Sequence, residues 1–107
     1  MELKRVVVTG LGALTPVGNN VAETWENLVK GISGAGPITH FDASKFKTHF
    51  ACEVKNFNGT DYIDRKELRK MDLYTQYAIA AAKEAVEDSG MDLEKEDLNR
   101  IGVIYGV

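Results

Sequence analysis

Uninterrupted apolar runs lie near both ends of the chain and predict two strands. The first contains three consecutive valines within residues 4–9, and the second is the closing stretch RIGVIYGV at residues 100–107. Runs without polar alternation are typical of parallel strands that are covered on both faces. Because two such strands do not make a stable sheet, we expect residues 1–107 to be the N-terminal portion of a larger α/β domain, with no internal boundary.

A short helix is predicted after the first strand, at about residues 21–30. Asn20 precedes it and Glu23 follows three positions later, which is the pattern of an N-cap and its return partner. Gly31 stands where a left-handed residue commonly ends a helix. The apolar residues that share one side of this helix are Trp25, Leu28, Val29 and Ile32.

Two further helices are predicted in the second half of the chain. Asp64 and Glu67 repeat the capping pattern around the stretch RKELRK at residues 65–70. A long helix over about residues 72–89 ends at Gly90, and alanines surround much of its middle, YAIAAAKEAV. Neighbours can therefore approach it closely on more than one side, and we expect a central, largely buried helix.

The remaining segments are predicted to be loops with one short strand. Residues 33–60 are expected to be mostly loop, and residues 92–99 a turn or short helix. Within the first loop, FACEVKNF alternates well enough for a strand with Phe50, Cys52 and Val54 on one face. A single free cysteine among apolar neighbours is usually a small buried hydrophobe, so we do not interpret Cys52 as a nucleophile.

Composition and charge set limits on the function. The chain has 107 residues, of which 44% are hydrophobic and 27% charged, as is ordinary for a globular domain. Its formal net charge of -3 gives no general reason to expect nucleic acid or an anionic membrane as a partner. No apolar run approaches the roughly 20 residues of a membrane span. The start lacks a signal-peptide core, so we expect a cytoplasmic protein without membrane insertion.

The glycines after the first strand raise the question of a nucleotide-binding loop. Gly10 and Gly12 fit the dinucleotide fingerprint, but Thr15 stands where the third glycine belongs, and Pro16 prevents a helix from beginning there. A phosphate loop would also need a lysine and a hydroxyl residue after Gly18. We therefore interpret these glycines as sites of close backbone packing beside a buried strand.

Other residues with chemical potential are isolated in the sequence. His40 and His49 have no further ligand at metal spacing, so we interpret both as loop or surface histidines and expect no metal site. Tyr74 and Tyr77 are interpreted as packing residues of the long helix.

One group of like charges stands out within RKELRK. At helical spacing residues 65 and 69 share a face, as do residues 66 and 70, and Glu67 is the one acid among them. By residue pattern alone, a solvated helix face is favoured. The members of this basic cluster are Arg65, Lys66, Arg69 and Lys70.

Five stretches in order, at fitting separations, resemble the N-terminus of the β-ketoacyl-acyl-carrier-protein synthases of type II. These are the elongating condensing enzymes of fatty-acid synthesis, and the resemblance covers essentially the whole chain. The stretches are RVVVTGLGALTPVG at 5–18, TWENLVKGISG at 24–34, HFDASKF at 40–46, RKELRKMDLYTQYA at 65–78 and DSGMD at 88–92.

The resemblance implies an α/β fold of the thiolase-like kind, layered α-β-α-β-α, of which this chain supplies the first part of the N-terminal half. The implied reaction is decarboxylative condensation of an acyl-enzyme with malonyl-acyl-carrier protein. Its cysteine nucleophile and two histidines lie beyond residue 107 in the family, so the chain carries no catalytic residue and is expected to be inactive alone.

The resemblance also implies partners. The substrates arrive on the phosphopantetheine arm of acyl carrier protein, with no separate cofactor, and the intact enzyme is expected to be a homodimer. Acyl carrier proteins are acidic, and the matching positions Lys66, Arg69 and Lys70 contribute to the family's docking surface for them. For these residues the resemblance favours docking over the solvated face.

Two other functions stay open at this stage. A ketosynthase-like partner subunit of the chain-length-factor type keeps the fold but lacks the nucleophile, and the first 107 residues separate it poorly from the enzyme. A nucleotide-binding oxidoreductase is the weakest candidate, because Thr15 and Pro16 oppose it.

Overall fold

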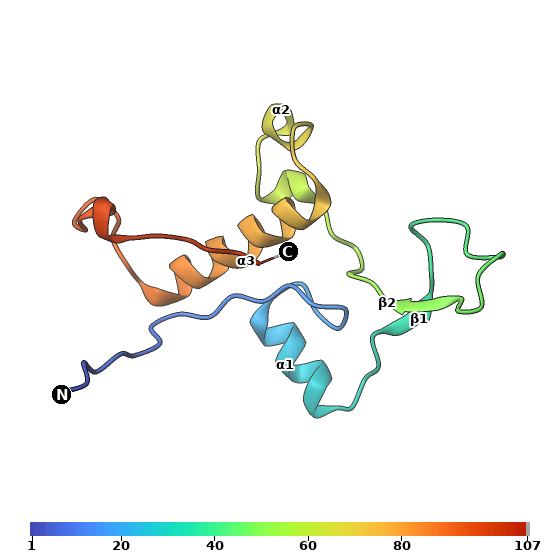
Figure 1. Ribbon diagram of the computed structural model, residues 1–107, viewed down its shortest axis with the longest axis horizontal. Coiled ribbons are helices and arrows are strands. Elements are labelled where there is room, and N and C mark those ends of the chain that lie inside the picture. The colour runs from blue at the N-terminus through green and yellow to red at the C-terminus, as the bar shows by residue number, and fades with distance from the viewer. Residues whose placement is uncertain (107) are drawn as a thin grey trace.

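The computed structural model describes residues 1–106 and has an elongated shape of 54 × 37 × 28 Å (Figure 1). Helices alternate with long irregular segments, and two short 3-10 helices lie in the second half of the described chain. In chain order the elements are α1 (Val21–Val29), β1 (Ala35–Pro37), β2 (Phe50–Cys52), η1 (Gly59–Asp61), α2 (Arg65–Leu68), α3 (Leu73–Ser89) and η2 (Leu98–Arg100).

Helix α1 begins where the capping pattern predicts. Asn20 Oδ1 accepts the Glu23 N–H at 2.8 Å, while the Glu23 carboxylate accepts the N–H of Asn19 at 3.2 Å, one residue before the cap. Gly31 has a φ of 70°, which confirms the left-handed ending. The apolar side of α1 is open to solvent, and its Trp25 is 67% exposed.

Helix α3 is the longest element, and its predicted extent is confirmed to within one residue. Gly90 ends it in the left-handed region with a φ of 67°. Among its residues only Ala80 is buried, so the prediction of a largely buried helix is wrong for the described chain. The segments beside α3 cover it only in part. They leave an open apolar cavity of about 590 Å³ between Val103 and the side of α3 that carries Ala78, Ala82 and Val86.

The glycine segment lies directly against the backbone of α3. A Cβ at Gly12 would collide with the carbonyl oxygen of Ala81, and one at Gly10 would come within 2.7 Å of the amide nitrogen of Ser89. The interpretation of these glycines as close-packing sites is therefore confirmed. The tight turn over residues 15–18 follows, closed by the Thr15 N–H donating to the Gly18 carbonyl at 2.8 Å.

Two acidic side chains of α3 fasten the same segment by accepting its backbone donors. Asp88 accepts the N–H of Leu11 at 2.9 Å, and Glu84 Oε2 accepts that of Ala13 at the same distance. The second oxygen of Glu84 accepts the N–H of Val21, the first residue of α1, at 2.9 Å. One carboxylate thus joins α3 to both the glycine segment and the start of α1.

Neither of the two predicted terminal strands is formed. Residues 4–9 and 101–106 pair with no strand and are exposed, with Ile104 at 99%. The first residue of the second predicted strand, Arg100, belongs to η2, and its last residue, 107, lies outside the described residues. In Figure 1 the N-terminal segment runs below α3, and the C-terminal segment overlaps the helix in the view. A strand needs hydrogen bonds to a neighbouring strand, and within residues 1–106 neither run has one, so both remain extended chain.

The sheet of the described residues is one short antiparallel hairpin, in which Gly36 pairs with Ala51. The sequence does not predict β1, because its glycine and proline are poor strand formers. The prediction of a short strand at β2 is confirmed. Cys52 is exposed, however, so its expected burial is wrong: a hairpin of two three-residue strands offers little cover to either face.

No helix in the described part of the chain is both long enough and apolar enough to cross a membrane.

Candidate functional site

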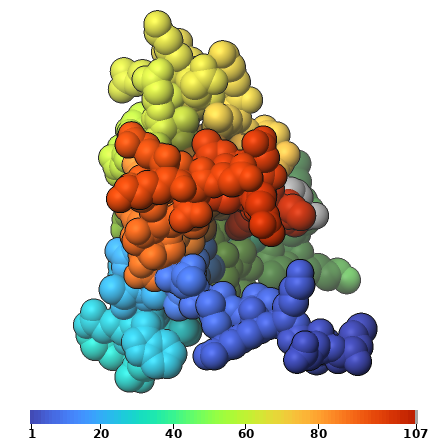
Figure 2. Space-filling model, turned by 90° about the vertical axis from the view of Figure 1, so that its left-hand side faces the viewer, coloured from blue at the N-terminus to red at the C-terminus, as the bar shows by residue number. Residues whose placement is uncertain are grey.

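Helix α2, which carries the basic cluster, is anchored on η1 and the start of α3. A Cβ at Gly59 would lie 2.5 Å from Leu68 Cδ1 and 2.6 Å from Gln76 Oε1, so both side chains close over this buried glycine. The Gln76 amide also donates to the Met71 carbonyl at 3.3 Å. The segment around α2 stands at the upper end of the molecule in Figure 2, with α3 below it.

Aromatic rings support this unit from the side of η1. Phe57 stacks on Tyr62 with ring centroids 5.8 Å apart, and it meets Tyr77 edge-on at 5.0 Å. Burial raises the pKa of the Tyr77 hydroxyl, and the negative charge of Glu53 adds to this. The packing role predicted for Tyr77 is confirmed, whereas that of Tyr74 is wrong, because this residue of the first turn of α3 faces solvent.

The local structure of α2 differs from the predicted capped helix. The Asp64 side chain makes no capping hydrogen bond, although its carbonyl accepts the Leu68 N–H at 2.9 Å. Glu67, the expected return partner, binds Lys70 instead. The α-helix ends at Leu68, and Lys70 belongs to a following turn in which its N–H donates to the Glu67 carbonyl at 3.0 Å.

All four side chains of the basic cluster are exposed. The Lys70 ammonium lies 3.1 Å from Glu67 Oε1. In the part of the chain that the structure describes, no ion pair engages Arg65, Lys66 or Arg69. The cluster therefore presents accessible positive charge on a short helix and turn, with one of its four cations already paired. Such a surface can attract and orient an anionic partner, but it holds no nucleophile or general base.

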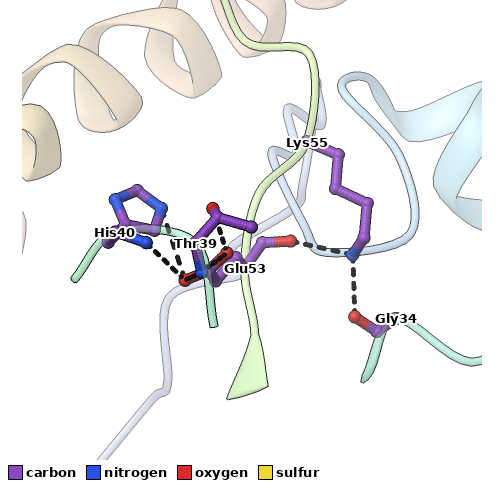
Figure 3. A network of polar contacts seen from close by, with 5 residues as sticks. All are labelled: Gly34, Thr39, His40, Glu53 and Lys55. Atoms are coloured by element: carbon purple, nitrogen blue, oxygen red, sulfur yellow. Dashed lines mark hydrogen bonds and ion pairs between the residues drawn. The ribbon is translucent and has the colours of Figure 1, made fainter. Parts of the chain in front are cut away.

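A second polar cluster, which the sequence analysis missed, joins the hairpin to the turn over residues 15–18 (Figure 3). The Lys55 ammonium donates to three carbonyl oxygens, those of Gly34 at 2.7 Å and of Pro16 and Glu53 at 3.0 Å each. These bonds use all three ammonium hydrogens. Because the partners are backbone atoms from separate segments, a lone lysine within the predicted strand FACEVKNF gave no signal of this role.

The carboxylate of Glu53 organises the other half of this cluster. It accepts the Thr39 hydroxyl at 2.8 Å and the backbone N–H groups of Thr39 and His40 at 3.1 and 3.3 Å. The hydroxyl hydrogen bond is the largest cause that holds the pKa of Glu53 below its ordinary value; desolvation opposes it, and the two N–H groups and His40 assist. The cluster fixes loops and leaves no group free for chemistry.

The two histidines occupy exposed loop positions, as predicted. His40 Nε2 lies 3.8 Å from Glu53 Oε1, and His49 directly precedes β2. Within residues 1–106, no group of three histidine, cysteine, aspartate or glutamate side chains could hold a metal ion.

Comparison with known families adds an independent observation. The family model described as the N-terminal domain of β-ketoacyl synthase matches residues 3–107 of this chain.

Curated proteins of high similarity carry one name. The 3-oxoacyl-[acyl-carrier-protein] synthase 2 of Staphylococcus aureus (strain COL) is 53% identical over 103 residues, which are 96% of this chain and 25% of the relative. That of Vibrio harveyi is 50% identical over 106 residues, 99% of this chain and 26% of the relative. The chain thus spans about a quarter of the length of the curated relatives it matches.

Solved structures extend the similarity to the fold. The ishigamide ketosynthase/chain length factor aligns with a TM-score of 0.76 and 41% identity, over 82% of this chain and 22% of that one. AntDE:AntF, a type II PKS acyl-carrier protein in complex with its ketosynthase bound to the hexaketide, gives a TM-score of 0.70 and 31% identity over 92% of this chain and 24% of that one. The α/β fold expected from the resemblance, the first part of a thiolase-like architecture, is confirmed.

Proposed function

This chain belongs to the β-ketoacyl synthase family, and we propose that it works as part of a β-ketoacyl-acyl-carrier-protein synthase that elongates acyl chains in fatty-acid biosynthesis. The observation that carries the proposal is the 53% identity to a 3-oxoacyl-[acyl-carrier-protein] synthase 2 over 96% of the chain. The reaction is decarboxylative condensation, an acyl transfer through a cysteine thiolate. The nucleophile and its two histidines belong to sequence beyond residue 107, and the described elements form part of the scaffold.

A ketosynthase-like partner subunit is the second candidate. It is favoured by the 41% identity to the ishigamide ketosynthase/chain length factor. The higher identity to the synthases supports the enzyme. The nucleotide-binding oxidoreductase is no longer a candidate, because the family match covers the glycine segment.

The basic cluster supplies the proposed contact with the partner. Lys66, Arg69 and Lys70 are exposed on a packed unit at one end of the molecule, where an acidic carrier protein can approach. A solved relative is itself a ketosynthase in complex with an acyl-carrier protein, which supports the same class of partner here. The acyl groups arrive on the carrier's phosphopantetheine arm, so no separate cofactor is needed. The intact enzyme is a cytoplasmic homodimer in this proposal.

Charge reversal at the cluster tests this docking role. We expect Lys66→Glu/Arg69→Glu/Lys70→Glu in the full-length enzyme to lower kcat/KM for the carrier-bound substrate about thirtyfold. Lost attraction and new repulsion together amount to roughly 2 kcal/mol. The change should appear mainly in KM, because surface charges steer encounter and do not touch the reacting atoms. The measurement is steady-state kinetics at low and high ionic strength, and salt should shrink the difference.

Two controls separate docking from other causes. A small thioester substrate should be used equally well by wild type and variant, so an equal loss with both substrates would indicate misfolding. Lys45→Glu/Lys47→Glu/Lys95→Glu makes the same change in net charge at exposed lysines away from α2 and should leave kinetics unaltered. Unchanged kinetics of the α2 variant with the carrier-bound substrate would contradict the docking role and indicate that the basic cluster is only a solvated helix face.

A further inference from the structure

Glu67 stands inside the basic cluster and is bonded to one of its members. Its Oε1 lies 3.1 Å from Lys70 Nζ, across the i, i+3 spacing that places both side chains on one side. The two side chains are 54% and 71% exposed, so the ion pair is in contact with water and can open readily.

The other proposed docking residues differ from Lys70 in this respect. Within residues 1–106 neither Lys66 nor Arg69 has an ion-pair partner, so an incoming carboxylate meets both without displacing a group. At Lys70 the same carboxylate must replace that of Glu67. Glu67 is therefore an internal competitor of the incoming carboxylate for Lys70.

We propose that Glu67 limits the affinity of this surface for the acidic carrier protein by competing with it for Lys70. The inference rests on the proposed docking function of the basic cluster. A carrier protein has to leave after each transfer, so a surface of limited affinity suits its role. An internal carboxylate that competes for Lys70 weakens the attraction between the surface and the carrier protein without touching the site of reaction.

The test is a binding measurement on the full-length enzyme with holo-acyl carrier protein as the probe. Glu67→Gln keeps the shape of the side chain and removes its charge. At low ionic strength we expect it to tighten the Kd about two- to fivefold, the range expected for one exposed ion pair, and high salt should remove the gain. Glu67→Ala removes the same carboxylate and should give a gain of the same size. Equal Kd values for wild type and both variants would overturn the inference.

A matched control exists on α1. Glu26 forms an i, i+4 ion pair with Lys30 there, so Glu26→Gln changes the charge equally and also frees a lysine, but not at the docking surface. It should leave the Kd unaltered. An equal gain from Glu26→Gln would show that net charge alone is responsible and would contradict the proposal.

A double-mutant cycle tests the competition itself. In a Lys70→Gln background there is no ammonium to compete for, so Glu67→Gln should there tighten binding less than about 1.5-fold. A full gain in that background would overturn the proposal. If Lys66→Glu/Arg69→Glu/Lys70→Glu fails to weaken carrier binding, the docking site and this inference fall together. If it weakens binding while Glu67→Gln matches wild type, the inference alone fails.

Discussion

Glu53 shows how much order a single side chain imposes on a loop. Its carboxylate accepts hydrogen bonds from the Thr39 hydroxyl and from the backbone N–H groups of Thr39 and His40, just after β1. The backbone carbonyl of Glu53 accepts a further hydrogen bond from the Lys55 ammonium. Hydrogen bonds to the ionised form favour that form, which is why the pKa of Glu53 lies below its ordinary value of 4.5. The loop is therefore stabilised by a charge.

This charge predicts a pH dependence with a definite sign. A lowered folded-state pKa stabilises the folded chain above pH 4.5, and the stabilisation is lost as the pH falls through the lowered value. Thr39→Val removes the largest cause, so the pKa of Glu53 should rise toward 4.5 and acid unfolding should begin at a higher pH. NMR titration of the side-chain carboxyl measures this directly. Asp42, whose pKa is lowered by hydrogen bonds from Ser44, is the internal control; an unmoved Glu53 would refute the assignment.

At the scale of elements, two helices with similar start patterns are begun in different ways. Asn20 caps α1 with a side-chain bond of 2.8 Å, whereas the side chain of Asp64 caps nothing at α2. Asn20→Ala should therefore destabilise the fold by about 1 kcal/mol, as is usual for a lost cap, and Asp64→Ala by much less. Thermal or denaturant unfolding of the two variants in the full-length enzyme compares them. Equal losses would show that the capping bond at Asn20 contributes nothing.

Helices were predictable from the sequence to the extent that their signals are local. Asn20, Gly31 and Gly90 fix the ends of α1 and α3 through groups a few residues away, and these limits are confirmed. The apolar runs predicted to be strands at residues 4–9 and 100–107 have the composition of strands, but within the described residues neither has a partner strand. Pairing is a long-range property that no local pattern contains. The β1–β2 hairpin shows the reverse: β1 contains a glycine and a proline, which are poor strand formers, yet it pairs with β2.

The candidate site also combines features that could be predicted from the sequence with features that could not. The exposure of the basic cluster followed from its sequence, and the i, i+3 spacing of Glu67 and Lys70 allows their ion pair, but the end of α2 at Leu68 and the turn after it were not predicted. The role of Lys55 could not be foreseen, since its three acceptors are backbone oxygens up to 39 residues away. The proposal that Lys66, Arg69 and Lys70 dock a carrier protein rested on family resemblance and not on the charges themselves.

At the scale of the whole molecule, the described chain is expanded and has little core. Its radius of gyration is 17.2 Å, against about 13 Å for a compact domain of this length. Ala43 and Ala80 are the buried apolar residues within residues 1–106, while valines of the first run and Trp25 are exposed. Apolar surface of this extent is normally covered by other parts of a fold or by a partner.

The 107-residue chain expressed by itself should therefore associate. We expect its apparent mass in sedimentation velocity to rise with concentration, and its thermal transition to be broad, because there is little core to melt cooperatively. A monodisperse monomer with a sharp transition would contradict this. The full-length enzyme, run in parallel, should give a defined oligomer at every concentration.

The contact between the glycine segment and α3 also limits when this part of the chain can fold during translation. Leu11 and Ala13 meet acceptors that are 77 and 71 residues further along the chain. A ribosome adding 5–20 residues per second needs about 4–15 s to translate that distance. Throughout this interval the N–H groups of Leu11 and Ala13 lack the carboxylates that accept them in the structure, and the two glycines beside them have no helix backbone to lie against. This part of the chain can therefore reach its described arrangement only after α3 has been translated, so its earliest possible folding time depends on the speed of translation.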